Sequence, residues 1–203
     1  MVGSISAEKV KVSFRQFSEQ VRGCRLCQGK YFDHDPRPIF LAEPASKVLV
    51  VGQAPSRRVH QTGKPWDDVS GENLRRWMGV TPEQFYDPQL FAIIAIGLCY
   101  PGTVPRKGDL PPPPICAPTW HPRFQEFIQP DITLLIGRYA QAYYLQTRES
   151  VSTVVHRWRE HLKEGFFPLP HPSPRNRKWI AERPWFEREC LPALREVTRT
   201  YLP

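Results

Sequence analysis

Two short loops carry polar side chains on a stiff backbone. The run GQAPS occupies residues 52–56, and the run HPSPRN occupies residues 171–176. In the second run, two prolines restrict a segment that carries an imidazole, a hydroxyl, a guanidinium and an amide. Such a segment can present donors to a phosphate or a nucleobase with little ordering cost. The Gly and Pro of the first run are equally compatible with an ordinary turn after a strand.

Four of the five cysteines have the spacing of a metal site. Cys24 and Cys27 form a Cys-x-x-Cys pair, and Cys99 and Cys116 flank a proline-rich segment. Thiols in a chain without an export signal argue against disulfides. One close pair plus two distant members suits zinc or a [4Fe–4S] cluster, and a chance distribution is the remaining alternative. Cys190 lies among apolar residues, so we expect it to be a packed core residue.

The segment TGKPWDDVSG at residues 62–71 combines a tryptophan with carboxylates. It could be an ordinary charged loop that precedes a helix, with Ser70 as the N-cap. Asp68 would then be a helix-terminus charge that the macrodipole favours.

Apolar patterns predict the elements that must position these segments. Short buried strands are expected at Lys47–Val51, Phe91–Ile96, Ile132–Ile136 and Phe166–Leu169. Helices are expected at Val10–Arg22, Gly71–Met78, Tyr139–Leu145 and Glu182–Tyr201. This alternation predicts a three-layer α/β/α sandwich around a short, mainly parallel four-stranded sheet. A site is expected beyond the carboxyl ends of the strands, where the loops at 52–70, 97–122 and 170–179 begin.

Composition narrows the class of protein. The 203 residues show no compositional break, which predicts a single domain over residues 1–203. The 28 basic and 20 acidic residues give a formal charge of +8, which favours a polyanionic partner such as DNA, although many other proteins are basic. No apolar run of about 18 residues and no signal peptide is recognisable, so we expect a cytoplasmic protein that does not interact with membranes.

The GQAPS and HPSPRN loops, in this order and at these strand ends, resemble the uracil-DNA glycosylase superfamily. The resemblance extends from about Cys24 to Trp179. The HPSPRN run is similar to the single-strand-selective type, and the cysteine pattern is similar to the iron–sulfur types of bacteria and archaea (families 4 and 5). The RRVH run at residues 57–60 is similar to a type that becomes trapped on DNA through a histidine. It lies much earlier in this chain, so we treat that similarity as accidental.

The resemblance implies a reaction. The chain would hydrolyse the N-glycosidic bond of uracil, and of other deaminated bases, in DNA and leave an abasic site for base excision repair. We expect a monofunctional enzyme, because water is the proposed nucleophile and no lysine is placed for a Schiff base. The alternatives are a non-catalytic module that binds damaged DNA and a glycosylase that acts mainly on hypoxanthine or xanthine. The expected partner is DNA that contains a deaminated base, bound by a monomer.

The resemblance also implies catalytic roles. His171 would stabilise the developing base anion. Trp66 takes the place of an aromatic residue that stacks on the flipped base. Gln53 stands where the common iron–sulfur type has Glu, and Ala54 stands where other types have Asp or Asn. We therefore assign the attacking water to Asp68, in a DVSG run similar to the Asp-Ala-Ser-Gly run of a broad-specificity type, with Gln53 as its helper.

Binding residues follow from the same resemblance. The base would be bound by Trp66, Gly52, Ala54, Pro55 and Ala95. An Asn that reads uracil stands at the position of Ala95 in the uracil-specific type, so its absence predicts looser specificity. DNA contacts are assigned to Ser56, Ser173, Pro174, Arg175, Asn176 and Lys64, with Arg57, Arg58 and His60 as further phosphate candidates. A structural [4Fe–4S] cluster, with zinc as the alternative, would be held by Cys24, Cys27, Cys99 and Cys116.

Overall fold

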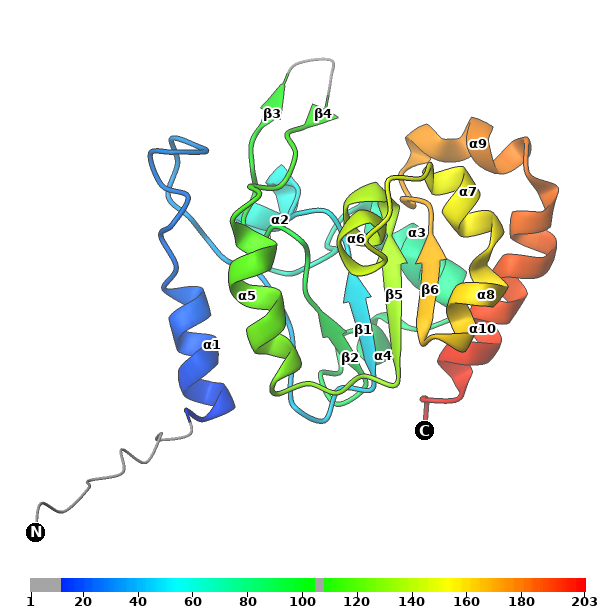
Figure 1. The fold of residues 1–203 in the computed structure, drawn as a ribbon, viewed down its shortest axis with the longest axis horizontal. Helices are drawn as coiled ribbons and strands as arrows, with labels where there is room; N and C mark the ends of the chain where they lie inside the picture. Colours follow the sequence, from blue (N-terminus) through cyan, green and yellow to red (C-terminus); the bar gives the residue numbers. More distant parts are fainter. Residues whose placement is uncertain (1–11, 105–107) are drawn as a thin grey trace, which may run out of the picture.

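A four-stranded parallel sheet forms the centre of the computed structural model, which describes residues 12–104 and 108–203 (Figure 1). Its strand order is β2 (Phe91–Ile93), β1 (Val48–Val51), β5 (Ile132–Ile136), β6 (Phe166–Leu169). Val48 pairs with both Phe91 and Ile132, so the strands begin at one level and their carboxyl ends meet at one edge.

Alternate residues of each strand face two different apolar layers. Val48 and Val50 pack in one core, whereas Leu49 and Val51 pack in the other. This alternation, with every residue of β1 and β5 buried, is typical of a parallel sheet that is covered on both faces.

Helices cover both faces of the sheet. The core of Leu49 and Val51 is covered by α1 (Phe14–Arg22), α5 (Cys116–Gln125) and α6 (Gly137–Tyr144). The core of Val48 and Val50 is covered by α3 (Val69–Met78), α4 (Pro82–Phe85), α7 (Val151–His156), α8 (Trp158–Lys163) and α10 (Leu191–Arg199). The predicted three-layer α/β/α sandwich is therefore confirmed.

Several predicted boundaries differ from the observed ones. The first helix begins at Phe14, because Ser13 and Gln16 form a capping box, and Val10 lies outside the described residues. The second strand ends at Ile93 rather than Ile96, although the amide of Ile96 still donates to the carbonyl of Gly52 (3.0 Å). The third predicted helix begins at Gly137 instead of Tyr139.

The closing helix is not regular. Its helical residues begin at Pro184 rather than Glu182, and Phe186–Cys190 forms a π-helical segment before α10. Pro192 has no N–H with which to continue the α-helical pattern, which accounts for the wider turn before it. Cys190 is fully buried there, as expected for a core residue.

The two long segments predicted as loops contain regular structure. Residues 52–70 include α2 (Arg57–Thr62), and residues 97–122 include an antiparallel pair of β3 (Thr103–Val104) and β4 (Gly108–Asp109). A further short helix, α9 (Arg177–Ala181), follows the HPSPRN loop. None of the helices in the described part of the chain is long and apolar enough to cross a membrane.

Candidate active site

The first loop is held in place by the sheet and by α2. The amides of Ile96 and Gly97 donate to the carbonyls of Gly52 (3.0 Å) and Gln53 (2.9 Å), which extends the pairing of β1 beyond its last residue. Ser56 is the N-cap of α2 and accepts a hydrogen bond from the amide of Val59 (3.3 Å). Both contacts fix the backbone shape of the loop.

Trp66 lies directly against this loop. A Cβ atom on Gly52 would be 2.7 Å from Cζ2 of the indole, so only glycine allows this approach. Trp66 itself has a φ of 56°, which is uncommon for a bulky residue. A Cβ on Gly71 would meet the carbonyl oxygen of Trp66 at 1.8 Å, so Gly71 makes room for this backbone. The indole ring is 5.7 Å from the His171 ring, centroid to centroid.

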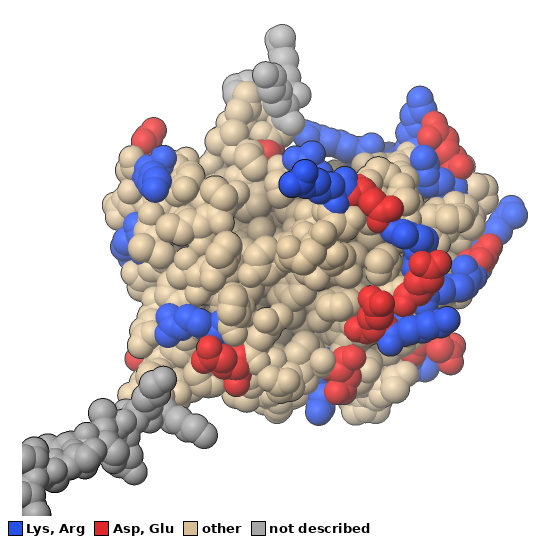
Figure 2. Space-filling view, in the orientation of Figure 1, with Lys and Arg blue, Asp and Glu red and all other residues tan. Residues whose placement is uncertain are grey.

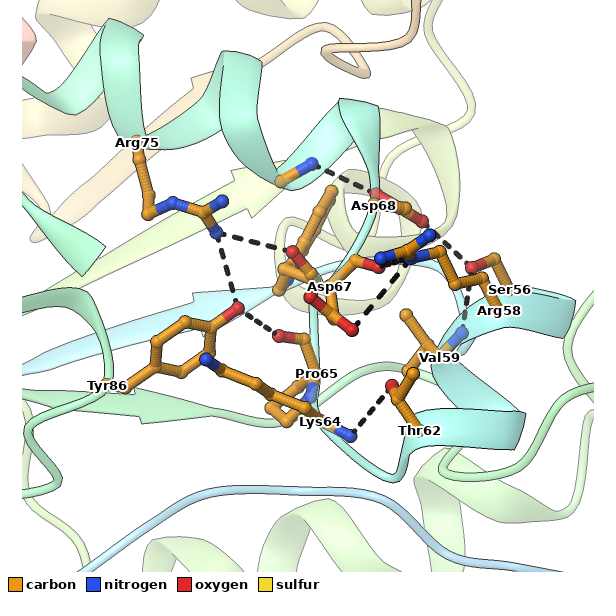
Figure 3. A network of polar contacts seen from close by, with 12 residues as sticks. Ser56, Arg58, Val59, Thr62, Lys64, Pro65, Asp67, Asp68, Arg75 and Tyr86 are labelled. Atoms are coloured by element: carbon orange, nitrogen blue, oxygen red, sulfur yellow. Dashed lines mark hydrogen bonds and ion pairs between the residues drawn. The ribbon is translucent and has the colours of Figure 1, made fainter. Parts of the chain in front are cut away.

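The carboxylate of Asp68 is held by two hydrogen bonds. Its Oδ1 accepts a hydrogen bond from the amide of Gly71 (3.0 Å), and its Oδ2 accepts one from Oγ of Ser56 (2.8 Å). Asp68 is thus the N-cap of α3, whereas Ser70 lies inside the helix, so the expectation of a Ser70 cap is wrong. Figure 3 shows the Asp68 carboxylate between the first turn of α3 and Ser56. Its capping role is compatible with a second role toward water, because each carboxylate oxygen has two lone pairs.

The second loop fixes one tautomer of His171. The amide of Ser173 donates to Nδ1 of His171 (3.2 Å), so the neutral ring carries its proton on Nε2. Burial lowers the pKa of His171, and the carboxylates of Asp68 and Asp109 oppose this effect. The ring is therefore held neutral at pH 7, with one N–H available as a donor.

Side chains from inside and outside this loop hold its backbone. The side-chain amide of Asn176 donates to the carbonyl of His171 (2.7 Å), and the side-chain amide of Asn73 in α3 donates to the carbonyl of Pro172 (2.9 Å). Ser173 caps the 3₁₀ turn Pro174–Asn176 by accepting from the amide of Arg175 (3.3 Å). The loop is thus attached to α3 as well as to β6.

These segments surround one cavity of about 530 Å³ at the carboxyl edge of the sheet. Its volume is in the range of small-molecule sites. The predicted residues that line it are Gly52, Gln53, Ala54, Pro55, Ser56, Trp66, Asp68, Ala95, His171, Ser173, Arg175 and Asn176. The further phosphate candidates Arg57, Arg58 and His60 do not line it, nor do two residues assigned to the DNA contacts. Pro174 begins the 3₁₀ turn, and the ammonium of Lys64 lies 3.9 Å from the centroid of the Tyr86 ring.

The hairpin of β3 and β4 adds three residues that were not predicted. Thr103, Gly108 and Asp109 line the cavity opposite the two loops. One signal was available in the sequence, because Asp109 is the only acidic residue between positions 97 and 122. The hairpin itself was not recognisable, since its strands are only two residues long.

The two pairs of cysteines come together at a second cavity. It is small and apolar, and its lining includes Leu98, Trp120, Cys24, Cys27, Cys99 and Cys116. The amide of Leu98 donates to Sγ of Cys116 (3.3 Å). Burial, together with the neighbouring thiol of Cys116, raises the pKa of Cys99 to about 12. Burial likewise raises the pKa of Cys116 to about 12.

The donor set of this second cavity consists of thiols, which bind zinc as well as iron–sulfur clusters. Four thiols surround one space, and thiolates are the ligands of [4Fe–4S] clusters. Within residues 12–104 and 108–203, however, no three His, Cys, Asp or Glu side chains are grouped closely enough to hold one metal ion.

Charge is uneven around the edge that carries the main cavity. Figure 2 shows Lys and Arg side chains beside the hairpin along this edge, with a few acidic side chains among them. Arg57, Arg58 and Arg175 are exposed residues of α2 and the second loop. Cations at this position attract a phosphate backbone.

A comparison with known protein families matches the part of the chain that contains the main cavity. Residues 39–195 match the family described as the uracil DNA glycosylase superfamily. The matched range includes both loops, the hairpin, Trp66 and Asp68, together with Cys99 and Cys116. It begins after Cys24 and Cys27.

Proposed function

Because the chain belongs to the uracil-DNA glycosylase superfamily, whose members are DNA glycosylases, we propose that it releases uracil from DNA. Hydrolysis of the N-glycosidic bond would leave an abasic site. One observation carries the proposal: Trp66, the backbone of the first loop and the neutral ring of His171 all face a single cavity. An aromatic face, a rigid backbone and an N–H donor are what a flipped base requires.

Trp66 provides the surface on which the base stacks. Stacking on an aromatic side chain contributes about 1–3 kcal/mol per base, which offsets part of the few kcal/mol lost on flipping. The indole cannot move toward Gly52, which it already contacts, and the carbonyl of Trp66 accepts from Arg75 (3.3 Å). The stacking surface is therefore preorganised.

His171 stabilises the leaving base. The base departs with the bonding electron pair, so negative charge develops on its ring. The Nε2–H of a neutral imidazole donates to that charge without any change in protonation state. Burial, which lowers the pKa of His171, keeps the ring in this form.

The attacking water is assigned to Asp68, with Gln53 as its helper. The Gln53 amide nitrogen donates to the carbonyl of Leu110 (3.2 Å), which leaves its oxygen to accept from water. Asp68 is held by two donors, Ser56 and Gly71, so its carboxylate orientation is fixed.

Base recognition is looser than in a strictly uracil-specific enzyme. Ala95 lines the cavity and carries no group that could pair with the base. Selectivity then depends on backbone donors and acceptors, which also fit hypoxanthine and xanthine. Uracil is the leading substrate, and these two purines are the next candidates.

Some of the side chains proposed to contact DNA already make hydrogen bonds within the protein. Arg175 is exposed at the cavity, where it could enter the groove or fill the space left by the flipped base. Ser56 already donates a hydrogen bond to Asp68, and Asn176 donates one to the carbonyl of His171. These two side chains therefore stabilise the site in addition to their proposed contact with phosphate. Ser173, Pro174 and Lys64 complete the proposed DNA surface.

We also propose that the four cysteines hold a structural [4Fe–4S] cluster, with zinc as the alternative. The cluster would cross-link the segment after α1 to α5 by metal–thiolate bonds. No step of the hydrolysis involves it, because its ligands line a different cavity from His171 and Asp68.

Release of free base from labelled oligonucleotides tests the proposal. Single- and double-stranded DNA with one uracil, hypoxanthine or xanthine should yield abasic sites, with uracil fastest. Asp68→Asn should slow release while DNA binding persists. Binding without any base release would identify a non-catalytic module, and a heat-stable adduct would identify the trapped type.

A further inference from the structure

The hairpin of β3 and β4 is joined to both catalytic loops. The side-chain amide of Gln53 donates to the carbonyl of Leu110, next to Asp109 (3.2 Å). On the other side, a Cβ on Gly108 would be 2.7 Å from Nη1 of Arg175. Gly108 has a φ of 98°, so glycine serves both the turn and this approach. The hairpin is therefore a wall of the cavity.

A chain of hydroxyl groups orients the carboxylate of Asp109. Oγ1 of Thr103, directly across the hairpin, donates to Oδ1 of Asp109 (2.7 Å). The hydroxyl of Tyr100 lies 2.5 Å from the same Oγ1. Since Thr103 gives its only proton to the carboxylate, Tyr100 must be the donor to Thr103. Tyr100 is buried, which anchors the chain in the protein.

Asp109 differs from Asp68 in how its oxygens are used. Both oxygens of Asp68 accept hydrogen bonds from α2 and α3. Among the described residues, only Oδ1 of Asp109 accepts one, so Oδ2 is available to water. Asp109 is also exposed, whereas Asp68 is half-buried. In the proposed binding mode, the flipped base fills the inner part of the cavity, which places the sugar on its open side.

We propose that Asp109 is a second catalytic carboxylate, which binds the attacking water on the solvent side of the sugar. This inference rests on the proposed glycosylase function. The water oxygen forms a bond to C1′ while the bond from C1′ to the base nitrogen breaks. The electron pair leaves with the base, which accepts from His171, and the proton lost by water passes to Oδ2 of Asp109. The carboxylate also stabilises positive charge that develops on the sugar.

The first loop explains why a second carboxylate is needed. Neither Gln53 nor Ala54 can accept a proton from water, and each oxygen of Asp68 already accepts one hydrogen bond. Asp68 and Gln53 therefore orient the attacking water, and Asp109 takes its proton. Asp109 enters from a different element and supplies, at the same cavity, an anionic oxygen that accepts no hydrogen bond from the described residues.

The test compares single-turnover release of uracil by wild type, Asp109→Asn, Asp109→Ala and Asp131→Asn. Asp131 is an exposed carboxylate just before β5, at the opposite edge of the sheet, so it controls for loss of one negative charge. Asp109→Asn should lower the rate constant at saturating enzyme by about 100-fold or more. The DNA Kd should stay the same or tighten. Asp131→Asn should match wild type.

Chemical rescue separates a catalytic carboxylate from a structural one. Added formate should restore part of the rate of Asp109→Ala and should not change the rate of Asp131→Asn. Thr103→Val should give a smaller loss, because it removes only the orienting hydroxyl. A wild-type rate for Asp109→Asn would overturn the inference while uracil release by wild type still supported the proposed function. A changed preference among bases at an unchanged maximal rate would also overturn it. No release by wild type would refute both.

Discussion

At the scale of single residues, the close approach of Gly52 and Trp66 fixes the surface on which we propose that the base stacks. Gly52→Ala should push the indole out of position, because its new Cβ would lie 2.7 Å from Cζ2 of Trp66. We expect uracil release to fall by about 10-fold or more, since misplacement by about 1 Å is enough for losses of this order. Single-turnover rates check this.

The control for Gly52→Ala is Gly23→Ala at the end of α1. A Cβ there would be 3.4 Å from the nearest atom, the carbonyl oxygen of Glu19, which is ordinary contact. Equal rates for the two variants would contradict the close approach of Trp66 to the first loop.

The protonation of His171 is a second prediction at this scale. Burial lowers the pKa of His171, and Asp68 and Asp109 raise it in part. The folded protein should therefore take up the His171 proton below pH 6.5, and Asp68→Asn should move this titration to still lower pH. NMR of the labelled imidazole measures both the titration and the Nε2–H tautomer. Titration at or above pH 6.5, or the opposite tautomer, would be inconsistent with the proposed donor.

At the scale of elements, the sequence predicts the central strands of the sheet, but it predicts the geometry of the candidate site only in part. The KVLVV and ITLLI runs identify β1 and β5 because every residue is buried. The hairpin could not be predicted, since its strands pair over only two residues each and leave no periodic pattern in the sequence. Asp68 lines the same cavity as the two predicted loops, but its hydrogen bond to Ser56 depends on how α2 and α3 meet.

His121 in α5 joins three elements and should make stability depend on pH. Its ring contacts the carbonyl of Ala95 (3.0 Å) and the hydroxyl of Tyr144 (2.8 Å), and burial lowers its pKa to about 4. The unfolded chain binds a proton near pH 6.5, so the unfolded state is favoured progressively as the pH falls from 6.5 to about 4. We expect a loss of up to about 3 kcal/mol over this range.

Urea unfolding at pH 7 and pH 5 measures this effect. His121→Phe should be less stable at pH 7, because Ala95 and Tyr144 lose a partner, but its stability should change less between the two values. His156 is exposed and serves as the matched control, His156→Phe. An equal pH dependence in wild type and His121→Phe would refute the assignment.

At the scale of the whole molecule, the cysteine cavity connects the N-terminal segment to the sheet. Protein purified without oxygen should be brown, with broad absorbance near 400 nm (about the usual region for such clusters). It should contain about four iron and four sulfide per chain, as a [4Fe–4S] cluster requires. Cys99→Ser should lose both colour and thermal stability.

Cys190→Ser is the matched control for the cluster, because Cys190 is buried in the other core, away from the cysteine cavity. It should keep its iron. A colourless wild-type protein with one zinc ion would contradict the cluster and support the alternative. Uracil release would not be contradicted by that result, since the two cavities have different lining residues.

The distribution of basic side chains over the molecule bears on the proposed binding of DNA. Basic side chains lie beside the hairpin at the carboxyl edge of the sheet, where the cavity opens (Figure 2). The same edge presents the loops after β1 and β6, so the proposed phosphate surface and the proposed base cavity lie at one edge of the sheet.

The most direct test is single-turnover release of uracil by wild type and His171→Ala. Wild type should convert a uracil-containing oligonucleotide to the abasic product. His171→Ala should bind the same DNA but release uracil about 100- to 1,000-fold more slowly, the loss typical of one oxyanion donor. Equal rates would contradict the assignment of His171. No release by wild type, with DNA binding intact, would contradict the glycosylase assignment itself.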